Sequence, residues 1–336
     1  MAHQPGLKQY VKSNFVKMGN GPTAWFASTT CVKQEMYGGW TQSLHVDPVP
    51  QEDIPEEEAD NEDGLQALID NSEGKIGIKL TTDLALTAPI EVGEGKEIIL
   101  DLGGNTLTAN NGTGIEVKGG KVTIDNGSIT GSKRALTVAN GGEAIVNGGT
   151  YTTTFEGQVM STQGEGSTLT INGGNFTSQE CGAMAFNGAT LIVNDGNFDT
   201  IDNFAIGTNG SEGRGKNTIV VNKATISANI TSANYEACGI YVANDDEVTI
   251  GKDVVINVLN GCGILMRAGN VTVKKGVKIN LTTDKGTNFT GYVGDNKTKM
   301  TQSGIIYHES ANYPGKAGMS LVVEDGVNIT GIAHSI

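Results

Sequence analysis

The chain has 336 residues and carries 37 acidic against 23 basic side chains, which gives a formal net charge of −14. This balance disfavours a nucleic-acid partner, because phosphate binding needs a concentrated basic face. The sequence contains no apolar run of about 18 residues that would span a membrane, and its first residues lack the apolar core of a signal peptide. We therefore expect a protein that is made in the cytoplasm and has no membrane span.

Residues 1–50 hold both tryptophans and six of the chain's aromatic side chains, broken into short pieces by glycine and proline. Fifty residues bury too little surface to fold alone, yet this stretch is too aromatic for a disordered tail. One interpretation is a small subdomain that packs on the rest of the chain. We favour an anchor that binds a partner, because Trp and Tyr dominate interface hot spots. The predicted anchor side chains are Tyr10, Phe15, Trp25, Phe26, Tyr37 and Trp40.

Residues 51–63 contain eight acids and no base, a composition that predicts a solvated, self-repelling linker. A short amphipathic helix is predicted over residues 64–71, with Leu65, Leu68 and Ile69 on one face and either Asn61 or Asp63 as its cap. We expect this helix to cover the open apolar end of the repeat that follows. Strands predicted at 76–80 and 90–92 lead into that repeat.

From residue 98 onward a short phrase recurs, in which alternating apolar residues are followed by Asp or Asn and then Gly. Its clearest copies are at 98–103, 122–127, 144–149, 169–174 and 191–196. Two further alternating runs lie between successive copies, so each repeat holds three short strands. A strand-built repeat of about 20 to 30 residues predicts a solenoid, here of about eight or nine coils. The last interval is about twice as long, and we interpret it as one coil that carries loops.

This pattern resembles the right-handed parallel β-helix of the pectate-lyase-like group over residues 64–336. The resemblance implies an all-β fold whose strands pair with the coils above and below. It concerns architecture and includes no catalytic motif. The last coil shows no polar capping element, so we expect an insertion (286–303 or 307–319) or another subunit to cover it.

One turn position of the repeat holds a row of acids and amides. Stacked Asn side chains hydrogen-bond along a solenoid and tolerate turn conformations, so we favour a structural ladder. The alternative is that the two acids form the carboxylate pair of a retaining glycosidase. Both acids stand at the N-terminal end of an otherwise amide row, which favours capping. The ladder residues are Asp101, Asp125, Asn147, Asn172, Asn194 and Asn222.

No catalytic residue, metal site or cofactor is predicted. The histidines all fall outside the regular coils, namely His3, His45, His308 and His334. Acids expected on outward strand positions do not cluster with the three arginines; these acids are Glu116, Asp199, Asp245, Asp246 and Glu247, and the arginines are Arg134, Arg214 and Arg267. Cys238 and Cys262 are expected to stack on adjacent coils, where a disulfide is geometrically possible, and we favour buried, reduced thiols. No Cys or His spacing is typical of zinc.

An aromatic anchor, an acidic linker and a short β-helix together resemble the layout of a virion surface protein of a tailed bacteriophage, of the head-fibre or capsid-decoration type. The resemblance implies that residues 1–50 bury Trp25, Phe26 and Trp40 in the major capsid protein or another virion protein. It also implies a virion-surface location, adhesion to host surface glycans and a homo-oligomer, for which a trimer is our guess. The alternative is a tailspike-like polysaccharide depolymerase or lyase. A third hypothesis is an adhesin exported without a leader.

Overall fold

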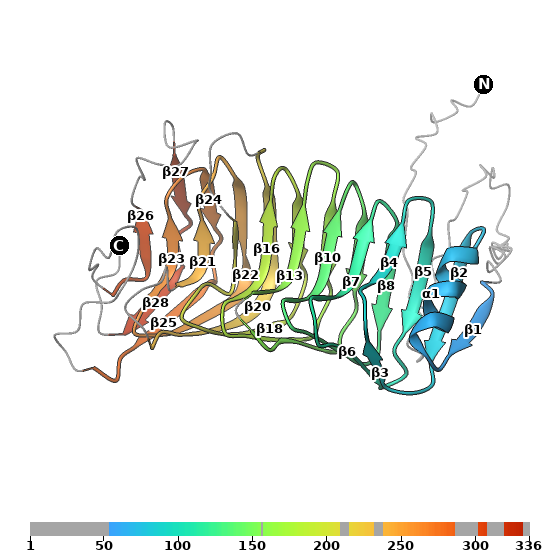
Figure 1. Ribbon diagram of the computed structural model, residues 1–336. Coiled ribbons are helices and arrows are strands. Elements are labelled where there is room, and N and C mark those ends of the chain that lie inside the picture. Colours follow the sequence, from blue (N-terminus) through green and yellow to red (C-terminus); the bar gives the residue numbers. More distant parts are fainter. Residues whose placement is uncertain are drawn as a thin grey trace, which may run out of the picture. The chain divides into compact units, whose positions relative to one another are not determined.

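The computed structural model describes residues 54–155, 157–208, 215–231, 238–285, 302–307 and 319–331. Over these ranges the chain forms a parallel β-solenoid of about nine turns (Figure 1). Each turn passes through three strands, and each strand pairs in parallel with its equivalents in the neighbouring turns. The strands therefore form three stacks. The prediction of an all-β parallel solenoid with three strands per coil is confirmed.

The stacks are named here in the order in which the chain enters them. Stack 1 contains β2 (Lys75–Leu80), β5 (Glu97–Asp101), β8 (Lys121–Asp125), β11 (Glu143–Val146), β14 (Thr168–Ile171), β17 (Thr190–Val193), β24 (Asn270–Val273) and β27 (Ser320–Val323). Stack 2 contains β3 (Leu84–Leu86), β6 (Thr106–Ala109), β9 (Ser128–Gly131), β12 (Thr150–Thr153), β15 (Asn175–Ser178), β18 (Asn197–Ile201), β25 (Lys278–Thr282) and β28 (Asn328–Gly331). Stack 3 contains β4 (Ile90–Gly93), β7 (Thr113–Lys118), β10 (Arg134–Ala139), β13 (Gln158–Gln163), β16 (Cys181–Phe186), β19 (Ile206–Thr208), β21 (Cys238–Val242), β23 (Cys262–Met266) and β26 (Ile305–Tyr307).

Two long strands join stacks 1 and 2 without a break. These are β20 (Thr218–Asn229) and β22 (Glu247–Leu259), whose first halves belong to stack 1 and whose second halves belong to stack 2. The register between them shifts after Val221, so that β22 carries one extra residue, Lys252, at the corner. In the last interval, β24, β25 and β23 pair directly with β27, β28 and β26. The interval is therefore one coil, as predicted.

The inward side chains of the three stacks form one continuous apolar core. Strand β14 shows the alternation that produces it, because Leu169 and Ile171 are fully buried whereas Thr168 and Thr170 are partly exposed. Near the start of β7 the core requires a residue without a side chain. A Cβ atom at Gly114 would lie 2.6 Å from Ile129 Cγ2, within the packed core.

Aromatic rings also stack from coil to coil inside stack 2. The ring of Phe176 lies between Tyr151 and Phe198, with centroid separations of 5.3 Å and 4.6 Å. These separations are typical of stacked aromatic pairs, which stabilise a core beyond the area they bury. The Tyr151 hydroxyl donates to the Gly148 carbonyl oxygen at 2.8 Å, and burial raises the pKa of Tyr151.

A helix and an extra strand precede the first full coil. Strand β1 (Glu56–Ala59) pairs in parallel with β2, and α1 (Glu62–Asn71) follows it with Asn61 as its N-cap. The prediction of a solvated linker is therefore wrong for residues 56–63, although three of the four β1 side chains are exposed glutamates. Composition does not predict this strand, because backbone pairing with β2 fixes its position and its side chains do not. The helix begins two residues earlier than predicted.

Helix α1 packs its apolar face on the first coil. Leu65 and Ile69 are fully buried, and Leu68 packs against the core from a half-buried position. The Gln66 side chain also pairs with the edge of β4, since its Oε1 accepts from the Glu91 N–H at 2.9 Å and its Nε2 donates to the Glu91 carbonyl at 3.0 Å. A side-chain amide thereby occupies the place of a neighbouring strand.

The last coil differs from those before it. In β27 the inward side chains of Leu321 and Val323 are half-buried, as is Ile329 in β28, whereas the inward residues of the earlier coils are fully buried. Val322 is 52% exposed. Among the residues that the structure describes, β27 and β28 pair with the preceding coil alone.

Candidate functional site

The predicted ladder residues occupy one position of successive coils at the corner between stacks 1 and 2, called corner 1. Each asparagine of the row donates its side-chain N–H to the residue one coil earlier. The distances are 2.9 Å from Asn147 to Asp125, 2.8 Å from Asn172 to Asn147, 2.7 Å from Asn194 to Asn172 and 2.8 Å from Asn222 to Asn194. The row therefore adds side-chain hydrogen bonds across five coils to the backbone pairing of the strands.

The two acids of the row lie on neighbouring coils as register partners. Asp101 Oδ1 accepts from the Gly103 N–H at 2.8 Å and from Asn126 Nδ2 at 3.3 Å. Asp125 Oδ1 accepts from Asn147. Asp125 thus ends the amide row by accepting from Asn147, whereas Asp101 accepts from donors outside the row. The backbones of the two acids are one coil step apart, which is about 4.8 Å.

A buried carboxylate occupies the corner between stacks 3 and 1, called corner 3. Asp246 is fully buried, so the prediction that it lies on an outward position is wrong. Its Oδ1 accepts from the Asn217 N–H at 3.0 Å and from Asn217 Nδ2 at 2.7 Å, and its Oδ2 accepts from the Asn244 N–H at 3.1 Å. Burial raises the pKa of Asp246, while these donors and the Thr208 hydroxyl lower it in part.

Other buried polar groups surround this carboxylate. Asn217 Oδ1 accepts from the N–H groups of Gly188 and Ala189 at 3.0 Å and 3.2 Å. Arg267 also lies in this part of the fold, with its N–H bonded to the Val242 carbonyl and its side chain 2% exposed. Sequence reasoning missed this cluster, because alternation alone does not show which corner residues turn inward. The cluster holds three successive coils together.

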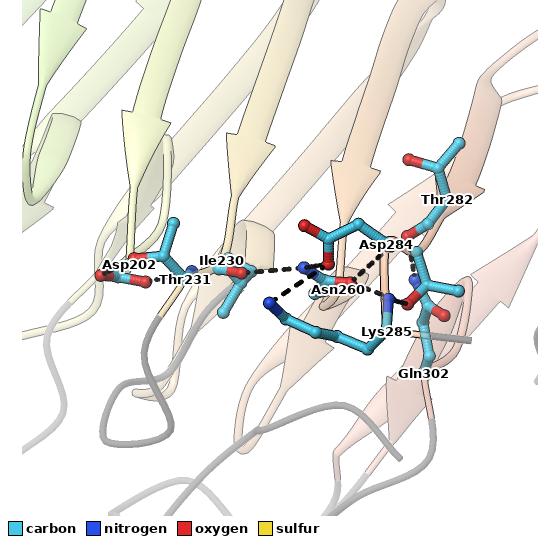
Figure 2. Close-up of polar contacts among 9 residues, drawn as sticks. Asp202, Ile230, Thr231, Asn260, Thr282, Asp284, Lys285 and Gln302 are labelled. Carbon is cyan, nitrogen blue, oxygen red and sulfur yellow. Dashed lines mark hydrogen bonds and ion pairs between the residues drawn. The ribbon is translucent and has the colours of Figure 1, made fainter. Parts of the chain in front are cut away.

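A third polar cluster lies at corner 2, between stacks 2 and 3 (Figure 2). Its centre is Asn260, which is 1% exposed and has a positive φ of 65°, a conformation that Asn tolerates. Asn260 Nδ2 donates to the Ile230 carbonyl at 3.1 Å and to Asp284 Oδ1 at 2.8 Å, and its Oδ1 accepts from the Thr283 hydroxyl at 2.8 Å. The hydrogen bond from Asn260 is the main reason that the pKa of Asp284 is lowered.

Other polar residues of corner 2 also form hydrogen bonds between neighbouring coils. Thr231 donates its N–H and its hydroxyl to the two oxygens of Asp202, at 2.5 Å and 2.7 Å. Gln302 Nε2 donates to the Thr282 carbonyl oxygen at 2.5 Å. Lys285 Nζ lies 3.4 Å from Asp284 Oδ1. Figure 2 shows Asn260 between Ile230 on the preceding coil and Asp284 on the following coil. Corner 2 is thus built from hydrogen bonds between coils.

The cysteines of the solenoid lie in stack 3. Cys238 and Cys262 are register partners on adjacent coils, as expected, and both are buried thiols, as is Cys181. They belong to a second apolar cluster with outward side chains of the same strands, among them Tyr241 and Leu265. The alternation of burial is therefore lost in the later strands of stack 3, where both faces are buried.

Several predicted residues lie outside the described ranges. These are the anchor side chains Tyr10, Phe15, Trp25, Phe26, Tyr37 and Trp40, and the histidines His3, His45, His308 and His334. Within the ranges that the structure covers, no three His, Cys, Asp or Glu side chains gather as a metal site. No described helix has the length and apolar character needed to cross a membrane.

Comparisons with models of protein families, with curated proteins and with solved structures found no match to this chain.

Proposed function

We propose that the chain is a non-enzymatic structural protein of a bacteriophage virion, of the head-fibre or capsid-decoration type. In this proposal residues 1–50 bind the major capsid protein or another virion component. The solenoid presents its corners and outward faces to the surroundings, where they adhere to glycans of the host surface. The protein is made in the host cytoplasm and acts on the virion surface as a homo-oligomer, for which we propose a trimer.

The hydrogen-bonded row at corner 1 is the observation that supports a structural role. Four asparagines and Asp125 form side-chain hydrogen bonds with one another along this exposed corner, so these groups are engaged between coils. The aromatic stack of Tyr151, Phe176 and Phe198 adds a second coil-to-coil contact inside the core. A solenoid bonded in this way from coil to coil is suited to hold a fixed form on a particle.

One observation favours a second candidate function. Asp101 and Asp125 are register partners, and the step between coils is close to the separation of about 5 Å between the carboxyl groups of a retaining glycosidase. A polysaccharide depolymerase would use one as the general acid and the other as the nucleophile. Against this, both carboxylates already accept hydrogen bonds, Asp125 from Asn147 of the row and Asp101 from the Gly103 N–H.

The experiment compares the wild-type chain with the W25A/W40A variant on phage particles. Particles are purified by density gradient from cells that encode either chain, and the protein is detected by immunoblot and by immunogold labelling. We expect the wild-type chain to purify with the particles and the variant to remain in the soluble fraction, because Trp side chains carry interface energy. The K79Q variant, altered on an exposed side chain of β2, is the matched control and should remain on particles.

The same preparations are incubated with host polysaccharides, and new reducing ends are measured. Release that is lost in the D101N/D125N variant would support the depolymerase and contradict the structural proposal. Absence of the wild-type chain from particles would contradict the virion assignment.

A further inference from the structure

In the last three coils, the row position of corner 1 is no longer occupied by Asp or Asn. By strand register, the position after Asn222 is taken by Gly251, then by Lys274 and then by Glu324. Gly251 cannot be replaced by a larger residue without a clash, because a Cβ atom there would lie 2.6 Å from the Asn222 carbonyl oxygen. The amide row therefore ends at Gly251, where the bulge adds Lys252.

A groove with a volume of about 750 Å³ opens on the surface at this place. Its lining consists of Lys252, Asp253, Val255, Lys274, Lys275, Gly276, Lys278 and Glu324. Four lysines and two acids give the lining a charge of +2, in a chain whose net charge is −14. The groove is thus a local basic site on an acidic protein.

One of the two acids is fully engaged by its neighbours. Glu324 Oε1 lies 2.8 Å from Lys274 Nζ, and Glu324 Oε2 accepts from the Lys275 N–H at 2.9 Å. These contacts lower the pKa of Glu324, with Lys274 as the larger cause. Among the described residues, no acid lies within ion-pair distance of the ammonium groups of Lys252, Lys275 or Lys278. Three ammonium groups are therefore available to a ligand.

The side chains of the groove indicate the chemistry of that ligand. A lysine ammonium is a compact charge with three rotatable donors, and it binds the oxygens of phosphate-type anions as a point charge. Lysines on neighbouring coils repeat at about 4.8 Å along the solenoid. Val255 offers an apolar surface, and Asp253 offers an acceptor for a hydroxyl group. A saccharide that carries charged esters has a partner for each of these features: the esters for the lysines, the ring faces for Val255 and the hydroxyl groups for Asp253.

We propose that this groove binds the phosphate or sulfate esters of an anionic glycan. The inference rests on the adhesive part of the proposed function, to which it adds a site and a ligand class. A nucleic acid is the less suitable polyanion, because the groove spans only three coils and the rest of the chain is acidic.

The test measures binding of the full chain to dextran sulfate, dextran phosphate and unmodified dextran by isothermal titration calorimetry at about 50 mM salt, where screening is weak. The two esters distinguish a sulfate from a phosphate source on one sugar backbone. We expect binding to at least one ester and none to unmodified dextran. The K252Q/K278Q variant should bind at least about tenfold more weakly, because two of the ammonium groups that contact the anionic esters are lost.

The matched control is K79Q/K133Q, which removes the same charge from exposed lysines outside the groove and should bind as the wild type does. The K252R/K278R variant keeps the charge and should retain binding. Equal losses in the two glutamine variants, or no binding to either ester, would overturn the proposal. Tighter binding to single-stranded DNA than to either ester would overturn the glycan assignment. Purified protein suffices for all these measurements, so they can fail while the chain is still found on particles, and the reverse also holds.

Discussion

Each asparagine in the middle of the corner 1 row acts as both donor and acceptor. Asn172 donates to Asn147 and accepts from Asn194, so one side chain joins three coils. We expect N172A to lower the free energy of unfolding by about 1 kcal/mol, because two exposed hydrogen bonds are lost and water replaces them in part. Urea unfolding followed by circular dichroism measures this change.

The control for this substitution is N110A, at an exposed asparagine outside the row. An equal loss in N110A, or an unchanged unfolding midpoint in N172A, would show that the row does not stabilise the solenoid.

At the scale of single elements, one carboxylate adds polar contacts to the packing of α1 on the first coil. Glu62 Oε1 accepts from the N–H groups of Thr87 and Ala88, both at 2.9 Å, and Oε2 accepts from the Thr87 hydroxyl at 2.9 Å. The Ala88 N–H is the largest cause that lowers the pKa of Glu62 below its ordinary value of 4.5. A lowered pKa in the folded chain means that the ionised form stabilises the fold, and that this stability is lost as the pH falls through the folded pKa.

We therefore expect E62Q to be less stable than the wild type at pH 7, by about 1 kcal/mol, because charge-assisted hydrogen bonds are replaced by weaker ones at a partly exposed site. The difference should shrink as the pH is lowered from about 5 to about 3. Thermal or urea unfolding at each pH measures it, with E94Q as the control at an exposed glutamate of the next turn. A difference that stays constant with pH would contradict this account.

Local patterns predicted the strands well and the corners less well. The strand predicted at 76–80 corresponds to β2, because alternation with a period of two is a property of neighbouring residues. The amide row was visible because its members follow the same short phrase. Asp246 and Lys252 could not be placed in this way, since the coils around them are 28 or 29 residues long and the register between coils fixes their positions. Glu62 was assigned to a linker because its partners lie 25 and 26 residues away.

At the scale of the whole solenoid, the two ends of the described coils differ. At the first coil α1 covers apolar side chains, and Gln66 pairs with the edge strand β4. In the last coil Leu321 and Val323 are half-buried, and Val322 is more than half exposed. Stability in a solenoid is approximately a sum over coils and their contacts. A coil with one described neighbour should therefore open more readily than a coil with two.

This asymmetry predicts the pattern of amide hydrogen exchange along the chain. Peptides from β27 and β28 should exchange faster than peptides from β14 and β15, because the central strands are paired on both sides and enclose fully buried side chains. Peptides from β4 should be protected in the wild type and should exchange faster in Q66A, which removes both side-chain hydrogen bonds to Glu91. Exchange followed by mass spectrometry measures both effects, with Q163A in β13 as a control distant from α1. If β27 were protected as strongly as β14 at every protein concentration, another part of the same chain would complete the last coil. Protection that rises with concentration would instead show that a second copy covers it, because association responds to mass action whereas an intramolecular contact does not.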